Sequence, residues 1–226
     1  MAKQHPMLRS LFSTLLLLLL STALFAQNIY SEDTWKARDR WQKVPEILEA
    51  IGLKAGAAIA DIGSHQGYMT FKFSAQVGHA GKVYAVDVDR RQLNALDNIL
   101  KERKVKNVET ILGDYDDPKL PAKSLDFAFI MDAYHEMDDY EDILRHVKKS
   151  LKPGGKLVIM EPIADERRGW SRNRQEAKHE IDMKYVIADL EKAGFKISRQ
   201  EDPFIDRSAK KNDEMWLLIA EIDLNN

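Results

Sequence analysis

The sequence predicts an α/β domain with a doubly wound, mostly parallel sheet of seven strands, helices on both faces and a C-terminal antiparallel hairpin. Two patterns carry this prediction. From residue 57 onward, short apolar runs alternate with amphipathic stretches, and strands that alternate with helices form right-handed βαβ units. The last two apolar runs have no room for a helix between them, so these two strands are expected to be antiparallel.

The composition fits one globular domain with an apolar core. Hydrophobic residues make up 44% of the 226 residues and charged residues 31%, as in soluble globular proteins. The chain has no Cys, which excludes disulfides, thiolate catalysis and Cys-ligated zinc. After the N-terminal leader, the chain carries 32 basic and 36 acidic side chains, and this excess of acid argues against a nucleic-acid partner.

Residues 1–26 are predicted to be a secretory signal peptide. Lys3 and Arg9 precede the apolar run LFSTLLLLLLSTALFA, and no charged residue occurs between Ser10 and Ser31. A basic segment, an apolar core and small residues before a cleavage point, here after Ala26, are typical of such leaders. The alternative is an uncleaved membrane anchor, because the run is just long enough to span a bilayer. Both interpretations place residues 35–226, after a linker at 27–34, outside the cytoplasm, in the periplasm or the medium.

The elements follow from their periodicity, in chain order. Residues 33–53 predict a helix broken near Pro45. Further helices are expected over 68–77, 90–104, 139–151 and from about 175 to 193. Strands are expected over 57–63, 81–89, 107–114, 124–133, 155–162, 195–202 and 214–223. The stretch KPGG at 152–155 is expected to end the preceding helix, and loops are expected over 164–174 and 203–213.

Four aspartates stand at or just after the ends of successive predicted strands: Asp61, Asp87, Asp114 and Asp132. The carboxyl ends of parallel strands meet at one edge of a sheet, and ligands bind there at the point where the strand order reverses. The sequence therefore predicts one ligand crevice that these carboxylates surround.

The glycine loop in ADIGSHQGYMT, residues 60–70, does not match a dinucleotide-binding fingerprint. Counted from Gly63, such a fingerprint needs glycine where His65 and Tyr68 stand, and no Gly-Lys-Ser/Thr is present for a Walker loop. Carboxylates at the strand ends suit other groups: a cationic amine for Asp61, a ribose diol for Asp87 and an exocyclic amine of adenine for Asp114. This set fits an aminoacyl nucleoside better than a nicotinamide dinucleotide.

From about Trp35 to Ile222, the chain resembles the class I S-adenosylmethionine-dependent methyltransferases, most closely the ubiquinone/menaquinone-biosynthesis type and its small exported relatives. The resemblance rests on five motifs in order: ADIGSHQGYMT, VYAVDVD, LGDYDDP, LDFAFIMDAYHEM and LKPGGKLVIMEP. It implies a Rossmann-like methyltransferase domain over 35–226, S-adenosyl-L-methionine as cofactor and a small-molecule methyl acceptor, which the sequence does not identify.

The resemblance also implies roles for individual residues. Asp61, Gly63 and Gly67 would hold the methionine portion of the cofactor, Asp87 would bind the ribose, and Asp114 with Tyr115 would border the adenine. Met131, Asp132 and His135 would line the reactive end. The same loops bring four more residues into the expected cofactor site: His65, Tyr68, Val88 and Gly113.

His65 departs from the family loop, which usually has glycine at this position. Histidine adopts positive φ more readily than most residues, so we expect the backbone turn to be kept. The favoured interpretation is a tolerated variant with ordinary or somewhat weaker cofactor affinity. The other interpretation is an impaired or altered site.

Methyl transfer from a sulfonium depends mainly on positioning, because the cofactor carries the reactivity. The stretch DAYHEMDD supplies the candidate catalytic residues, His135 and Tyr134, with His135 as a possible general base. Alternatively His135 only shapes the pocket, and Glu136 with Asp138 and Asp139 caps the next helix. No metal site is predicted, because the histidines lack a spacing such as HExxH.

Two further alternatives stay open at this point. Arg167, Arg168, Arg172 and Arg174 surround Trp170; they could recognise the acceptor, although a solvated loop is favoured. Export also separates the domain from a cofactor made in the cytoplasm, so an exported non-catalytic binding protein with the same fold is the second functional hypothesis. A nicotinamide-dependent reductase is disfavoured by the glycine loop, and the sequence does not indicate an oligomeric state.

Overall fold

The computed structural model describes residues 32–223 and divides the chain into two compact units, Met1–Trp41 and Gln42–Asn226. The described part of the first unit is helix α2 (Glu32–Gln42), whose last residue belongs to the second unit. Within α2, the Arg38 guanidinium lies 5.8 Å from the centroid of the Trp41 ring. The expected leader lies outside the described residues. The helix begins inside the expected linker at 27–34, because no glycine or proline interrupts the chain there.

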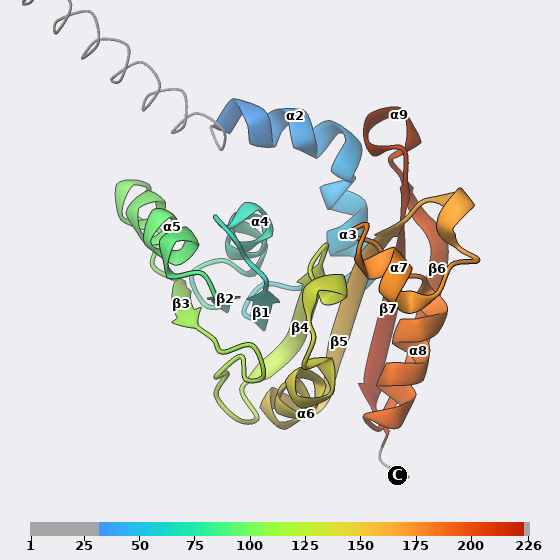
Figure 1. Ribbon diagram of the computed structural model, residues 1–226. Helices are drawn as coiled ribbons and strands as arrows, with labels where there is room; N and C mark the ends of the chain where they lie inside the picture. Colours follow the sequence, from blue (N-terminus) through green and yellow to red (C-terminus); the bar gives the residue numbers. More distant parts are fainter. Residues whose placement is uncertain (1–31, 224–226) are drawn as a thin grey trace, which may run out of the picture. The chain divides into compact units, whose positions relative to one another are not determined.

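The second unit is built on a seven-stranded sheet with the strand order β3-β2-β1-β4-β5-β7-β6 (Figure 1). The first five strands pair in parallel, and β7 is antiparallel to both β5 and β6. The strands are β1 (Ala58–Ile62), β2 (Lys82–Asp87), β3 (Val108–Leu112), β4 (Leu125–Met131), β5 (Leu151–Ile163), β6 (Phe195–Asp206) and β7 (Glu214–Ile222). The predicted doubly wound sheet with a C-terminal antiparallel hairpin is confirmed.

Helices cover both faces of this sheet. Helices α3 (Val44–Ile51), α4 (Tyr68–Val77) and α5 (Arg90–Glu102) lie on one face, and α6 (Tyr140–Ser150) and α8 (Met183–Lys192) lie on the other (Figure 1). Four short helices complete the unit: η2 (Tyr134–Glu136), η3 (Asp165–Arg167), α7 (Arg172–Glu176) and α9 (Ser208–Lys211). Within residues 32–223, no helix is both long and apolar enough to cross a membrane.

The core forms because the central strands are apolar on both sides, as parallel strands between two helix layers must be. In β4, Ala128, Phe129 and Ile130 are fully buried. On the face of α4, Phe73 packs edge-on against Phe129, with ring centroids 4.9 Å apart. The helix break predicted near Pro45 occurs at Lys43, whose φ of 49° separates α2 from α3.

The region expected to be one helix ending at Ala193 is two helices, α7 and α8, with a turn between them. The turn forms because the backbone of Ile181 is bound elsewhere: its N–H donates to the Pro162 carbonyl, and its carbonyl accepts the Trp216 indole N–H. Asp182 then caps α8 by accepting the Lys184 N–H. Part of the loop expected over 164–174 is likewise helical, in η3 and the start of α7.

Two predicted loops are parts of strands. KPGG does follow the end of α6, but it forms the irregular beginning of β5, where Leu151 pairs with Leu125 and Gly154 has a φ of 78°. Residues 203–206, expected in a loop, continue β6 past an irregularity, and Ile205 pairs with Met215. Neither bulged extension has the regular alternation of a strand, so the sequence pattern did not show them.

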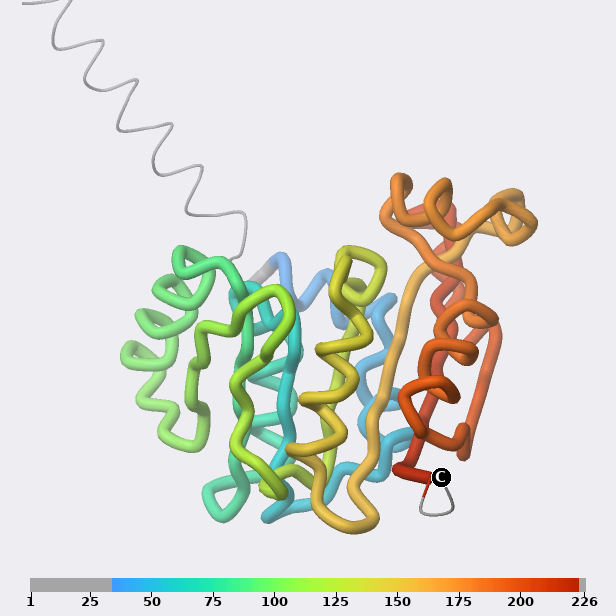
Figure 2. Tube along the Cα trace, turned by 60° about the horizontal axis from the view of Figure 1, so that its bottom comes forward, coloured from blue at the N-terminus to red at the C-terminus, as the bar shows by residue number. Residues whose placement is uncertain are grey.

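The carboxyl ends of β1 to β5 lie along one edge of the sheet. Strand β1 pairs with both β2 and β4, so the strand order reverses beside it and creates the switch point at which such folds bind ligands. Figure 2 shows that the loop after β4 and the segment containing α7 lie at the same edge as the glycine loop after β1. The predicted crevice residues are therefore on neighbouring loops.

A substitution at Gly81 tests the close packing of β2 against α4. A Cβ atom at Gly81 would lie 2.5 Å from Val77 Cβ and 2.7 Å from the Ala57 carbonyl oxygen, whereas one at Gly169 would meet no atom within 4 Å. We expect Gly81→Ala to lower the free energy of unfolding by about 1–3 kcal/mol through overpacking, and Gly169→Ala to change it by less than about 1 kcal/mol. Urea unfolding measures both, and equal midpoints for the two variants would contradict the packing described.

Candidate functional site

The glycine loop after β1 needs glycine at Gly63 and Gly67 for two separate reasons. Both have positive φ, 79° and 87°, which glycine adopts without strain. A Cβ atom at Gly63 would lie 2.7 Å from Ala133 Cβ, and one at Gly67 would lie 2.6 Å from Leu96 Cδ1. The missing side chain at Gly63 is what lets this loop approach the loop after β4.

His65 also has positive φ, 51°, so the prediction that histidine would keep the turn is confirmed. The residue is exposed. Its backbone N–H donates to Asp87 Oδ2 over 2.8 Å. This contact needs only the backbone and would be available to glycine as well.

Asp87 ends β2 with its carboxylate held by two backbone donors. Oδ2 accepts the His65 N–H, and Oδ1 accepts the Asp89 N–H, each over 2.8 Å. A carboxylate offers about four acceptor positions, so roughly two are left for a ligand. The half-buried Asp87 is thus oriented by the protein and still able to accept hydroxyl groups.

Asp61 ends β1 in a more enclosed setting. The residue is 4% exposed, and its Oδ2 accepts the Thr70 hydroxyl over 2.5 Å. Thr70 belongs to α4, which begins at the buried Tyr68. The first turn of this helix therefore fixes the carboxylate at the end of the strand.

The loop after β3 lies beside Asp87. Gly113 donates its N–H to the Asp87 carbonyl over 3.1 Å, and Asp114 Oδ2 lies 2.9 Å from Lys119 Nζ. Val88 and Tyr115 are 42% and 75% exposed, and they are the large hydrophobic residues found exposed among those described. Exposed apolar groups on adjacent strand ends are suited to the two faces of a planar ligand ring.

The loop after β4 carries the residues expected at the reactive end. Asp132 follows the strand with a φ of 57°, and its Oδ2 lies 3.7 Å from Arg207 Nη1. Met131, the last residue of β4, has its sulfur 3.6 Å from Gln42 Nε2. The fold thus brings the ends of β1, β2, β3 and β4, with their four aspartates, to one edge.

Sequence reasoning missed Glu161, which fixes the loop after β4. Glu161 lies in β5 and is fully buried. Its Oε1 accepts the N–H groups of Ala133 and Tyr134 over 2.7 and 2.8 Å, and its Oε2 lies 2.5 Å from His135 Nδ1. The available signal was a lone carboxylate inside the apolar run LVIMEP, because a buried charge requires partners.

The His135 side chain is only 1% exposed. Burial by itself lowers the pKa of His135, but the hydrogen bond and the charge of Glu161 raise it, and the net shift of the pKa is upward. Nδ1 contacts Glu161, whereas Nε2 has no hydrogen-bond partner and lies 3.8 Å from Glu136 Oε1.

Tyr134, the other residue expected to be catalytic, lies in the core with its hydroxyl bonded to α8. Its ring is fully buried, and its hydroxyl donates to Asp189 Oδ2 of α8 over 3.0 Å. Burial and the neighbouring Asp189 carboxylate raise the pKa of the phenol far above its ordinary value. These contacts favour a structural role for Tyr134, which joins η2 to α8, and its catalytic role stays a prediction.

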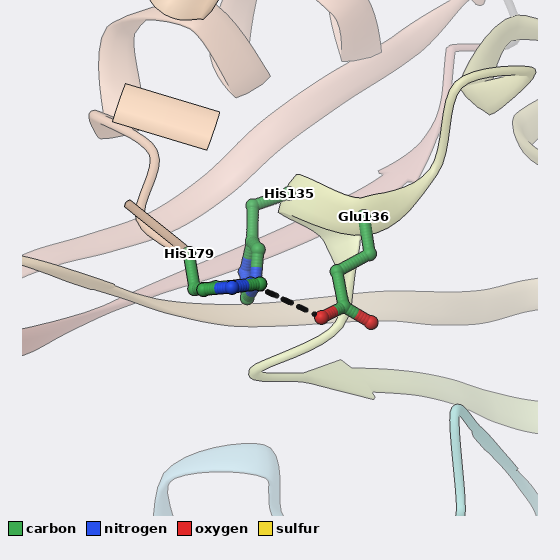
Figure 3. A group of neighbouring side chains, drawn as sticks. All are labelled: His135, Glu136 and His179. Carbon is green, nitrogen blue, oxygen red and sulfur yellow. Dashed lines mark ion pairs between the residues drawn. The ribbon is translucent and has the colours of Figure 1, made fainter. Parts of the chain in front are cut away.

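His135, Glu136 and His179 form a cluster at this edge, shown in Figure 3. His179 Nδ1 lies 3.3 Å from Glu136 Oε1, and the two imidazole centroids are 5.6 Å apart. We predicted no metal site because no two histidines have a spacing such as HExxH along the chain. The fold brings in His179 from the turn between α7 and α8, which that argument could not include.

The arginines around Trp170 are tied into the fold. Arg168 contacts Asp165, Asp202 and Glu214. Arg172 contacts Glu176 and Asp189, and Arg174 lies 4.1 Å from the Trp170 ring centroid. Arg167 pairs with the buried Glu180. These contacts fit a structural role better than either the solvated loop favoured from sequence or an acceptor site.

Comparisons with known proteins agree with this architecture. Residues 59–155 match the family model described as a methyltransferase domain. The chain is 30% identical over 115 residues to the ubiquinone/menaquinone biosynthesis C-methyltransferase UbiE of Hahella chejuensis, covering 50% of this chain and 46% of that protein. It is 30% identical over 128 residues to the demethylmenaquinone methyltransferase of Lactococcus lactis, covering 57% and 50%. The chain thus spans about half the length of these curated relatives.

A solved structure shows the same fold over most of the chain. The SAM-dependent methyltransferase from Aquifex aeolicus superposes with a TM-score of 0.70 at 24% identity, covering 84% of this chain and 98% of that one. The family match covers β1 to the start of β5, which includes the glycine loop and the acidic strand ends. Residues 59–155 are thus similar to the methyltransferase domain family, and the chain shares the fold of this SAM-dependent methyltransferase.

Proposed function

We propose that this protein transfers the methyl group of S-adenosylmethionine to a small-molecule acceptor. The observation that carries the proposal is the arrangement at the ends of β1 and β2, where the N–H of His65 in the glycine loop orients the Asp87 carboxylate. A carboxylate that is held in place and keeps free acceptor positions suits a ribose diol. The family resemblance supplies the cofactor that has such a ribose.

The proposed cofactor site runs along the edge of the sheet. The buried Asp61 and the glycines Gly63 and Gly67 would hold the methionine portion, whose ammonium group complements a carboxylate. Gly113 and Asp114 would border the adenine, with Val88 and Tyr115 as its apolar neighbours. Met131 and Asp132 would then lie toward the sulfonium. Exposure of Val88 and Tyr115 supports this assignment, because a bound adenine would cover them.

The reaction needs little from the protein beyond placement of the two reactants. The sulfonium is already an activated methyl donor, so an enzyme of this kind mainly aligns the acceptor in line with the methyl group. Tyr134 has no part in this scheme, because its hydroxyl is bound to Asp189. His135 lies in the correct loop, but its Nδ1 is committed to Glu161, so only Nε2 could take part in chemistry.

The acceptor is left as a small molecule of undefined class. The named relatives act in ubiquinone and menaquinone biosynthesis, according to their names. The family match, however, ends at residue 155, before the segment from η3 to α8 that would complete an acceptor site. Export through residues 1–26 also stays a prediction, which sequencing of the mature N-terminus would decide.

The assignment of Asp87 to the ribose can be tested with two ligands and two proteins. Wild type is expected to bind S-adenosylhomocysteine at least about tenfold tighter than its 2′-deoxy form, which is about 1.4 kcal/mol for one hydroxyl bound to a charged acceptor. In Asp87→Asn this preference should fall below about threefold, because the amide carries no charge and its NH₂ group must face one of the two backbone donors that the carboxylate accepts. Calorimetric titration measures all four affinities.

Comparing the two ligands separates a lost contact to the 2′-hydroxyl from a displaced glycine loop, because a displaced loop would weaken the binding of both ligands by the same factor. Glu109→Gln is the matched control, since it removes an equal charge from a side chain in β3 that pairs with Lys82 at 2.8 Å. The control should keep the wild-type preference. An unchanged preference for the 2′-hydroxyl in Asp87→Asn would exclude Asp87 as the ribose ligand.

Substitutions at His65 test whether cofactor binding depends only on its backbone N–H, and not on its imidazole. Both His65→Gly and His65→Ala keep the N–H that donates to Asp87, so cofactor affinity should stay within about threefold of wild type in each. The alanine variant should be less stable than the glycine variant by about 1 kcal/mol, because only glycine adopts positive φ without strain. A tenfold loss of affinity in both variants would show that the imidazole itself binds the cofactor.

A further inference from the structure

Three potential metal ligands converge beside the loop after β4. One nitrogen of His135, one nitrogen of His179 and one carboxylate oxygen of Glu136 lie within 4.8 Å of one another (Figure 3). Figure 3 shows His135 and Glu136 projecting from η2 and His179 reaching them from a separate segment of the chain. Two imidazoles and a carboxylate are the donor set of many three-ligand metal sites.

His135 Nε2 is the atom that distinguishes this cluster from a chance surface grouping. The side chain is 1% exposed, and Nε2 has no hydrogen-bond partner. When Nδ1 carries the proton that it donates to Glu161, Nε2 presents a lone pair. Glu136 Oε1 lies 3.8 Å from Nε2, too far for a hydrogen bond, and a metal ion bound there would displace any proton that Nε2 carries. A cation between them would satisfy both, and an unsatisfied buried nitrogen is costly.

Glu161 supplies the support that a metal-bound histidine requires. Metal-ligating imidazoles usually donate their second N–H to a carboxylate, which fixes the ring and raises its basicity. Here that contact is 2.5 Å long, and the second oxygen of Glu161 is held by two backbone N–H groups. The ring of His135 is thus oriented before any ion binds.

The segment that carries His179 is also fixed. His179 has a φ of 56°, in a region that non-glycine residues rarely adopt. The two residues that follow His179 are held by hydrogen bonds: Glu180 Oε2 accepts the Ala164 N–H, and the Ile181 N–H donates to the Pro162 carbonyl. This turn therefore holds an imidazole close to Glu136 in an otherwise unfavourable backbone conformation.

A second grouping, Asp132 with His135 and Glu161, is a weaker candidate. A metal ion there would have to replace the hydrogen bonds that Glu161 already accepts from the loop. It would also face the guanidinium of Arg207, whose Nη1 lies 3.7 Å from Asp132 Oδ2. The positive charge of Arg207 disfavours a cation at that position.

We propose that His135 Nε2, Glu136 and His179 Nδ1 bind a divalent first-row transition metal ion of the Zn²⁺ class. Imidazole donors favour such ions over Mg²⁺ and Ca²⁺, which prefer oxygen ligands. Three protein ligands leave a coordination position open for water or for an oxygen atom of a small molecule. The site is separate from the carboxylates of Asp61 and Asp87, so metal binding does not depend on the proposed methyl transfer.

Cobalt is a suitable probe, because its visible absorption reports on its ligands. Full-length protein without a histidine tag is stripped with a chelator and titrated with Co²⁺. We expect one Co²⁺ per chain, displaced by Zn²⁺, which competes for the same imidazole and carboxylate ligands. Both His179→Ala and Glu136→Gln should weaken Co²⁺ binding at least tenfold. These side chains are 75% and 63% exposed, so the unfolding midpoint of metal-free Glu136→Gln should match that of wild type. The midpoint of metal-free His179→Ala should fall only slightly, because alanine adopts the φ of 56° at this position less readily than histidine does.

His79→Ala is the matched control, since it removes an exposed histidine from the turn between α4 and β2 at the other edge of the sheet. This variant should bind Co²⁺ as wild type does, within twofold. Zn²⁺ should raise the thermal midpoint of wild type and of His79→Ala, but not that of His179→Ala. Absence of Co²⁺ binding in wild type, or equal affinity in His179→Ala and His79→Ala, would overturn the proposal.

Discussion

The buried carboxylate of Glu161 holds the functional edge of the sheet together. It lies in β5, where no water is available to solvate its charge, and it accepts three hydrogen bonds from the backbone and side chain of residues 133–135. Loss of such partners would leave a buried charge uncompensated, which is among the most costly defects a fold can have. These three hydrogen bonds attach the loop after β4 to β5.

The position of that loop determines what the neighbouring loops can do. Ala133, held by Glu161, comes so close to Gly63 that no side chain fits at position 63. The glycine loop then continues to His65, whose backbone N–H orients Asp87. One continuous series of contacts therefore links β5, β4, β1 and β2, and it ends at the carboxylate proposed to bind the ribose. On its other side, the same carboxylate of Glu161 orients His135 toward Glu136 and His179.

Much of this could be predicted from sequence, because the signals were local. Alternating apolar and amphipathic segments predicted the order of strands and helices in the sheet, and the glycines and aspartates at strand ends predicted where the proposed cofactor site lies. The rest depends on contacts between distant segments. Glu161 was overlooked because its partners, two backbone N–H groups and the His135 ring, lie on another strand's loop. The hydrogen bond of Tyr134 could not be foreseen, because Asp189 lies far along the chain in α8. The break between α7 and α8, which brings His179 into its cluster, arises from the binding of Ile181 to β5 and to Trp216.

The central claim is that the carboxyl edge of β1, β2 and β3 binds an adenosyl cofactor. A crystal structure of the protein with S-adenosylhomocysteine tests this claim most directly. We expect the ribose hydroxyls on Asp87, the adenine between Val88 and Tyr115, and the amino group near Asp61, with the glycine loop unchanged. A nucleoside bound elsewhere on the chain, or an edge that stays empty at saturating ligand, would contradict it.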